Sequence, residues 1–184
     1  MRLTIPAFVA LCLAGHASAD PALVAGGLAG GASISREAYF PTYFAGGVLA
    51  LDVPIVKNLS LEGRARVQAY FHPEDEDFGS HGVQNDVTLG LRLAVVQGRS
   101  VSPYLVVRGG LLAIHRVPYC RSCPRKKIVG MEAGLAAGLD IVRRSGLGIR
   151  LELAYDHPSV TAGDDVSGPA GELSGALLFV GPLR

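Results

Sequence analysis

The sequence predicts an all-β protein, an eight-stranded antiparallel up-and-down transmembrane β-barrel that follows an export segment. Three observations predict this fold. Apolar and polar residues alternate over segments of about ten residues, the length that a tilted membrane strand needs. Eight such segments can be delimited, and an even number of antiparallel strands can close into a barrel. The connections between them alternate between short and long.

Composition sets limits on the class of protein. The 184 residues contain 17 Lys and Arg against 16 Asp and Glu, and the mean hydropathy is +0.33. This balance excludes a charged disordered tail and a basic nucleic-acid-binding protein, so we expect no nucleic-acid partner. The length fits one domain. With 24 Gly, 11 Pro and no Trp, the chain favours turns and strands over helices.

The first residues have the pattern of a secretory signal peptide. Arg2 precedes an apolar stretch at 5–15, and the small residues Ala17-Ser18-Ala19 follow before the first acidic residue. A short positive region, an apolar core and a small-residue cleavage site define such signals. We therefore expect residues 1–19 to be removed after Ala19, which leaves residues 20–184 as the barrel domain.

Three strands are clear from the alternation alone, at 59–71, 83–95 and 147–156. In the first, odd positions are Leu, Gly, Ala, Val and Phe, whereas even positions are Ser, Glu, Arg, Gln and Tyr. In a strand this pattern gives one apolar and one ionic face, whereas a helix would scatter the charges around its circumference. Five further strands are richer in Gly and Ala, at 21–35, 43–53, 103–115, 128–142 and 172–180.

The connections predict which end of the barrel carries the loops. Short turns fall at 54–58, 97–102 and 143–146, and longer loops at 36–42, 72–82, 116–127 and 157–171. Short turns at one end and long loops at the other are typical of outer-membrane barrels, whose long loops are extracellular. Aromatic residues near the strand ends predict two girdles at the membrane interfaces; these are Tyr39, Phe40, Tyr43, Phe44, Tyr70, Phe71, Tyr104, Tyr155 and Phe179.

With these strands and loops, the chain resembles the small eight-stranded outer-membrane β-barrel proteins, the OmpA/OmpX-like group, over residues 20–184. The resemblance implies a place in the bacterial outer membrane, with lipid and the outer-membrane assembly machinery as partners. That group usually ends on an aromatic residue that the machinery reads, whereas this chain ends at Arg184. Leu173, Leu177 and Phe179 keep the alternation, so recognition would use Phe179.

If the Leu, Val and Ile face points to lipid, the other face places charged side chains inside the barrel. Six acids and five bases are predicted there: Glu62, Arg64, Arg66, Asp86, Arg92, Arg108, Glu132, Asp140, Arg150, Glu152 and Glu172. Buried charges are costly unless paired, so this nearly balanced set predicts a cross-strand ion-pair network and a plugged lumen. The alternative is a gated ion or proton path through the same charges.

Two features lie in the third long loop. Cys120 and Cys123 are the cysteines left after signal cleavage, and in an exported chain they predict a local disulfide. Free thiols, a redox motif or a zinc site that recruits His115 and His81 are the alternatives; we expect no metal and no cofactor. The same loop carries a basic group, Arg116, Arg121, Arg125, Lys126 and Lys127.

This basic group is a candidate anion site for lipopolysaccharide phosphates or another polyanion. The alternative is that it pairs with the acidic residues of neighbouring loops, at 74–77 and at Asp164 and Asp165.

One constellation could carry catalysis. His157 and Ser159 share a face of an extended strand, and Glu172 lies on the next strand, so a Ser nucleophile, a His base and an orienting acid could meet. The His-x-Ser element resembles that of the outer-membrane lipid A deacylases. Val160 stands where that family has Asn, and the strand register turns Glu172 inward. The alternative is a polar entry to a loop.

The favoured function is therefore a monomeric, non-enzymatic outer-membrane barrel that anchors extracellular loops for envelope integrity or surface contact. The first alternative is a lipid A deacylase-like hydrolase that uses Ser159 and His157. The second is a soluble lipocalin-like barrel in which the same alternation is turned inside out around an apolar ligand. Periodicity alone does not separate the inside from the outside.

Overall fold

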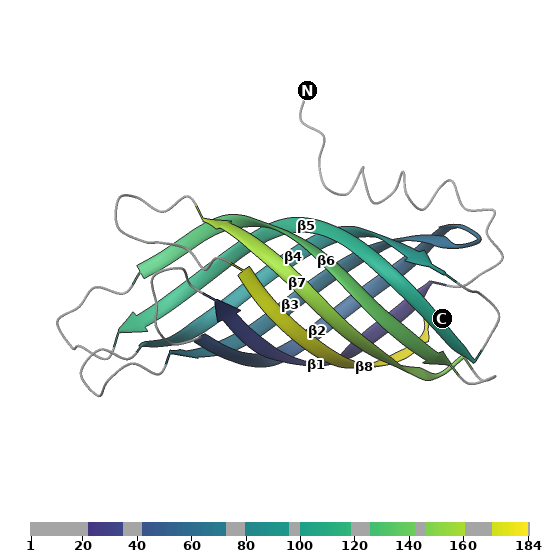
Figure 1. Cartoon of the computed structure of the whole chain (residues 1–184), viewed down its shortest axis with the longest axis horizontal. Helices are drawn as coiled ribbons and strands as arrows, with labels where there is room; N and C mark the ends of the chain where they lie inside the picture. Colours follow the sequence, from purple (N-terminus) through teal and green to yellow (C-terminus); the bar gives the residue numbers. More distant parts are fainter. Residues whose placement is uncertain are drawn as a thin grey trace, which may run out of the picture.

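A computed structural model describes residues 22–34, 42–72, 80–95, 100–118, 126–142, 146–160 and 171–183. All regular secondary structure in these segments is β-strand, and eight strands close into one antiparallel barrel (Figure 1). Within the described segments no helix has the length and hydropathy required to cross a membrane. The predicted fold, an eight-stranded antiparallel up-and-down barrel, is confirmed.

The strands run in chain order around the barrel. They are β1 (Leu23–Ile34), β2 (Thr42–Val56), β3 (Leu59–His72), β4 (Ser80–Ala94), β5 (Val101–Pro118), β6 (Lys126–Val142), β7 (Gly148–Val160) and β8 (Gly171–Pro182). Each pairs with its neighbours in sequence, and β1 pairs with β8 from Leu23↔Pro182 to Ile34↔Gly171. The backbone N–H of Leu183 also donates to the carbonyl of Ala22 at 2.8 Å. Closure therefore leaves no edge strand in the sheet.

Several strands are longer than the alternation predicts, mostly at the loop end, and at the turn end in β2, β5 and β8. β5 and β6 continue as a paired hairpin to Arg116↔Lys126, and β7 continues through His157 to Val160. At the turn end, β2 runs to Val56 with a register shift between Pro54 and Val56. These segments contain Pro and charged residues that favour loops locally, but ladder pairing with a neighbour satisfies their backbone groups.

The turns at the opposite end are tight. Lys57 and Asn58 alone connect β2 to β3, where Val56 pairs with Leu59. Gly146 precedes β7 with φ of +82°, in the left-handed region that L side chains rarely adopt. The connection between β2 and β3 thus lies within the predicted turn at 54–58, although β2 extends into it. The connection before β7 runs to Leu147, one residue beyond the predicted turn at 143–146, and β5 begins at Val101, inside the predicted turn at 97–102.

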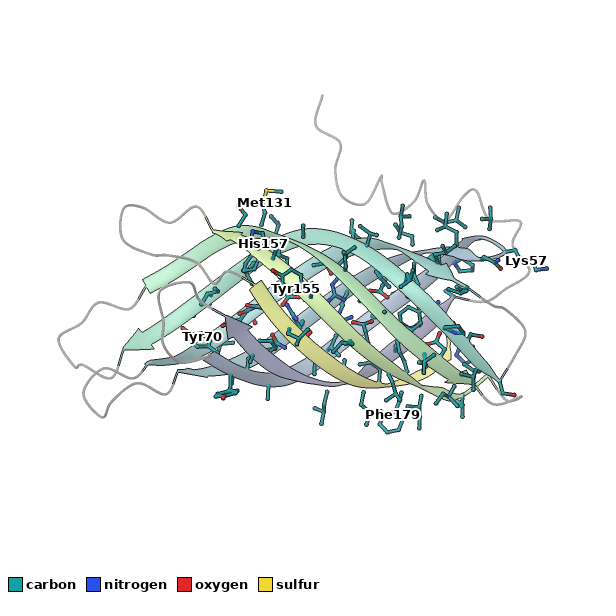
Figure 2. All side chains as sticks on the ribbon, in the orientation of Figure 1. Lys57, Tyr70, Met131, Tyr155, His157 and Phe179 are labelled. Atoms are coloured by element: carbon teal, nitrogen blue, oxygen red, sulfur yellow. The ribbon has the colours of Figure 1, made fainter. Side chains whose placement is uncertain are left out.

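Inner and outer faces differ sharply in polarity. Large apolar side chains point outward from every strand and are exposed, for example Leu135 at 60% and Phe179 at 69%. Figure 2 shows Phe179 and Met131 pointing away from the barrel wall. The charged strand residues whose side chains the structure describes are buried on the inner face. The alternation predicted the two faces, and the structure puts the apolar face outside.

Glycines on the inner face make room for large inward side chains. Tyr104 on β5 pairs with Gly138 on β6, and a Cβ atom at Gly138 would lie 2.4 Å from the Tyr104 hydroxyl oxygen. Tyr70 pairs with Gly82 in the same way. Large and small residues therefore interlock across neighbouring strands, so that the narrow lumen is filled without clashes.

The prediction of aromatic girdles is wrong for three of these residues. Phe44, Tyr70 and Tyr104 are buried inside the barrel, whereas Tyr43, Tyr155 and Phe179 point outward. Alternation already separated them, because adjacent residues such as Tyr43 and Phe44 must face opposite ways. Tyr39 and Phe40 lie outside the described residues.

Replacing Gly138 by Ala should destabilise the barrel, because the new methyl group would collide with Tyr104 and with the backbone carbonyl of Leu151. We expect a loss of about 1–3 kcal/mol in the free energy of unfolding, as for other overpacked cores. Urea unfolding of the protein in detergent micelles measures it. Gly47→Ala is the control, since its Cβ would approach no atom closer than 4.0 Å. Equal stability of both variants would contradict the interlocking.

Candidate functional site

The charged residues predicted for the lumen all lie there. The eleven side chains point inward from β3, β4, β5, β6, β7 and β8, and none of these residues is more than 7% exposed. They are Glu62, Arg64, Arg66, Asp86, Arg92, Arg108, Glu132, Asp140, Arg150, Glu152 and Glu172. The alternation of each strand is sufficient to place them, because residues two apart share a face.

Two further carboxyl groups in the lumen were missed. Asp52 on β2 and Asp156 on β7 are buried on the inner face. Asp52 is the second-last residue of the predicted strand 43–53 and Asp156 the last residue of the predicted strand 147–156, and both continue the inner-face positions of their strands. The described inner face therefore carries eight carboxyl groups and five guanidinium groups, so the near balance predicted from the sequence is not present.

The end of the lumen near the short turns holds the first group of charges, the turn-side cluster of Asp52, Glu62, Arg92, Asp140 and Arg150. Arg150 donates from Nε to Asp140 Oδ1 at 2.8 Å and from Nη2 to Asp52 Oδ2 at 2.5 Å. Arg92 donates to Asp140. Two carboxylates thus share the planar fork of Arg150, the geometry for which Arg is suited.

Tyr104 lies beside this cluster and connects it to the middle of the lumen. The guanidinium carbons of Arg92 and Arg150 lie 4.2 Å and 5.1 Å from the centre of its ring, within the range of cation–π attraction. Its hydroxyl donates to Glu152 Oε2 at 3.0 Å. Tyr104 therefore contacts two guanidinium groups with the face of its ring and a carboxylate with its hydroxyl group.

The middle of the lumen is built on Glu152 and Arg108. Arg64 and Arg108 both donate to Glu152, Arg108 from Nη1 at 3.1 Å. Arg108 also donates from Nε and Nη2 to the two oxygens of Asp156, at 3.0 Å and 2.9 Å. Arg108 thus bridges β7 to β5 and links Glu152 to the charges nearer the loops.

The end near the loops holds the loop-side cluster of Arg66, Asp86, Glu132, Asp156 and Glu172. Arg66 Nε donates to Asp86 at 2.6 Å and Nη1 to Asp156 at 3.2 Å. Its Nη2 lies 3.5 Å from one oxygen of Glu132 and 3.5 Å from one of Glu172. One guanidinium group therefore faces four carboxyl groups. The buried side chains of Phe44, Tyr70, Leu112 and Ile114 form an apolar cluster toward the loops.

The candidate catalytic residues do not come together. His157 and Ser159 are exposed on the outer face of β7 (Figure 2 labels His157), as their spacing predicts. Glu172 lies on the inner face, where its oxygens accept from Gln84 Nε2 at 3.1 Å. The barrel wall thus separates the acid from the other two residues, because Glu172 occupies an inner-face position of β8 whereas His157 and Ser159 occupy outer-face positions of β7.

The features predicted in the third long loop lie largely beyond the described segments. Cys120, Cys123, Arg121 and Arg125 are outside them, so the disulfide and the anion site stay predictions. The backbones of Arg116, Lys126 and Lys127 belong to β5 and β6, where Arg116 pairs with Lys126 and His115 with Lys127. His115, an alternative zinc ligand, points outward from β5.

Solved structures share this fold at low sequence identity. The chain is similar to Neisserial surface protein A, NspA, with 10% identity, a TM-score of 0.62, and 86% of this chain and 94% of that chain covered. It is also similar to Ail, the attachment invasion locus protein of Yersinia pestis, solved with the heparin analogue sucrose octasulfate, with 13% identity, a TM-score of 0.57, and 88% and 96% covered.

The chain has the fold of the small eight-stranded outer-membrane barrels. No protein-family model matches its sequence, and no curated protein matches it. The likeness therefore extends over nearly the whole chain in structure and shows the fold alone.

Replacing Arg150 by Met should strongly destabilise the barrel. The change leaves Asp52 and Asp140 without their shared partner in a site excluded from water, and breaking a buried ion pair costs about 3–5 kcal/mol. Thermal and urea unfolding in detergent would measure the loss. Lys57→Met, in the exposed turn between β2 and β3, should change stability by no more than about 0.5 kcal/mol. If the free energy of unfolding of Arg150→Met equals that of the wild type, the ion pairs of Arg150 contribute no net stability.

Proposed function

We propose that this protein is an outer-membrane β-barrel without enzymatic activity, whose rigid wall presents extracellular loops for envelope integrity or surface contact. The observation that carries the proposal is the distribution of polarity. The described strands expose Leu, Val, Ile, Met and Phe around the outside and bury eight carboxyl and five guanidinium groups inside. This is the arrangement that hydrocarbon requires and that water disfavours.

The outer face supports membrane insertion in a second way. Each of the eight strands is 12 to 18 residues long, more than the roughly 9–11 residues that cross a hydrocarbon core. Barrel closure pairs the backbone groups that lipid cannot hydrogen-bond. A soluble barrel of lipocalin type would need the opposite polarity, with apolar side chains surrounding a ligand.

The interior supports a structural role rather than transport. A barrel of eight strands is only wide enough for its own side chains. Arg66, Arg150, Tyr104 and Leu112 are among the largest fully buried side chains and fill the lumen at different depths. We therefore propose that the barrel does not conduct. Glu172 lies on the other side of the barrel wall from His157 and Ser159, so it cannot act as the orienting acid of a hydrolase site there.

We further propose that the loops bind phosphate groups of lipopolysaccharide or a similar polyanion. The support comes from the five cations Arg116, Arg121, Arg125, Lys126 and Lys127, which lie within or beside the loop between β5 and β6. Arg and Lys bind phosphate through charge-assisted hydrogen bonds, and the loop end of an outer-membrane barrel lies at the level of these headgroups.

Cell fractionation tests the membrane assignment. The protein should sediment with outer membranes and require detergent for release. Leu135→Arg, on the outer face of β6, should reduce the membrane-inserted fraction, because an Arg near the bilayer midplane costs about 2–4 kcal/mol. Leu135→Val is the matched control and should insert normally. Recovery of the wild-type protein in the periplasmic fraction without detergent would refute the assignment.

Calorimetric titration with lipopolysaccharide tests the loop proposal. A variant with Gln at Arg121, Arg125, Lys126 and Lys127 should bind at least about tenfold more weakly, since each charge-assisted bond contributes about 1.5–3 kcal/mol. Phosphatase-treated lipopolysaccharide should bind the wild type equally weakly. Lys57→Gln, at the opposite end of the barrel, should bind like the wild type. Equal affinity of the loop variant and the wild type would contradict the proposal.

A further inference from the structure

The lumen contains more negative than positive groups, and the excess is concentrated at one end. The turn-side cluster has three carboxyl groups and two guanidinium groups, and the middle has two arginines, Arg64 and Arg108, with one carboxyl group, Glu152. The loop-side cluster has four carboxyl groups and one guanidinium group. The loop-side cluster therefore has the least compensated charge of the described interior.

Glu132 is the least satisfied member of this cluster. Its side chain is 2% exposed, and neither carboxyl oxygen has a hydrogen-bond partner. The nearest positive atom is Arg66 Nη2 at 3.5 Å, and this nitrogen lies at the same distance from Glu172. Arg66 uses its other two nitrogens for Asp86 and Asp156. No described cation is therefore dedicated to Glu132.

The surroundings prevent bulk water from screening this charge. The groups that face Glu132 from other strands are Arg66 on β3, Asp86 on β4, Asp156 on β7 and Glu172 on β8, with Arg108 of β5 behind Asp156. The apolar cluster of Phe44, Tyr70, Leu112 and Ile114 lies toward the loops. A trapped water molecule could satisfy hydrogen bonds but would leave the net charge unchanged.

We propose that the loop-side cluster is a binding site for a small monovalent cation, centred on Glu132 and Glu172. The cation is a proton, held by one of these carboxyl groups, or an alkali ion held between them. A positive charge at this point would offset the repulsion among four carboxyl groups in a medium of low dielectric constant.

The site would link the stability of the folded barrel to the medium at its loop end. A ligand that binds only the folded state stabilises it in proportion to occupancy, so removal of the cation should lower the melting temperature. The proposal concerns the interior and does not depend on the loop ligand or on surface contact.

Thermal unfolding of the full-length barrel in a non-ionic detergent tests the site. Melting temperatures are measured at pH 5.5 and pH 9, in sodium chloride and in N-methyl-D-glucamine chloride of equal ionic strength. A proton site predicts a lower melting temperature at pH 9 in both salts. An alkali-ion site predicts a lower melting temperature at pH 9 only in the bulky organic cation, which cannot enter the lumen.

Two isosteric variants separate this site from general effects of pH. Glu132→Gln removes one uncompensated charge, so at pH 9 in the organic-cation salt it should melt at least about 5 °C above the wild type. At pH 5.5 the two proteins should melt within about 2 °C of each other. Glu152→Gln is the matched control: Glu152 accepts from Arg64 and Arg108, and its neutralisation should lower the melting temperature at both pH values.

Two results would overturn the proposal. One is a Glu132→Gln protein that melts below the wild type under every condition, as the control should. The other is a wild-type melting temperature that changes with neither pH nor the salt cation. This second measurement needs no variant, so the site stays testable even where Glu132→Gln fails to fold.

Discussion

The need to pair every backbone N–H and C=O group governs this structure. In hydrocarbon an unpaired strand edge costs several kcal/mol for each group, and the pairing of β1 with β8 removes the edge. Once eight strands close, the width of the lumen is set, and so is the division of each strand into an outer and an inner face. Within this closed frame the sequence places large apolar side chains on the outer face and charged side chains on the inner face.

A narrow lumen then decides which inner side chains are possible. The buried tyrosines fit because a glycine stands opposite on the neighbouring strand, as Tyr104 fits over Gly138 and Tyr70 over Gly82. Charged groups fit only where partners reach across the lumen, as Arg64 reaches Glu152 and Arg150 reaches Asp52. Buried pairs of this kind add little stability compared with well-packed apolar residues, but loss of one partner is costly.

The sequence predicts most of this fold because alternation is a local property. The period-two alternation of side chains along a strand predicts the eight strands. It also predicts the inner position of Arg66 or Glu152 and the shared face of His157 and Ser159. Partnership across the lumen does not follow, because it depends on the tilt and stagger of strands far apart in the chain. Arg64 and Glu152, for example, are 88 residues apart. Asp52 and Asp156 lie within the predicted strands 43–53 and 147–156 but were missed as lumen groups because they stand at the strand ends, where Pro54 and His157-Pro158 indicated that a loop begins, whereas ladder pairing continues past both.

The packing and polarity of the two faces also limit where the barrel can bind a partner. In the proposed membrane setting the outer wall stays apolar to face lipid, and the inner face is filled by buried charged groups, most of which are paired across the lumen, so most changes on either face would lower the stability. The connections at the loop end need neither face lipid nor fill the lumen. The chain places there its Cys pair and its acidic run at 74–77, and Lys126 and Lys127 follow at the loop end of β6. An interior cation site beneath the loops would let the medium outside act on the stability of the wall that holds them, without any change in the loops themselves.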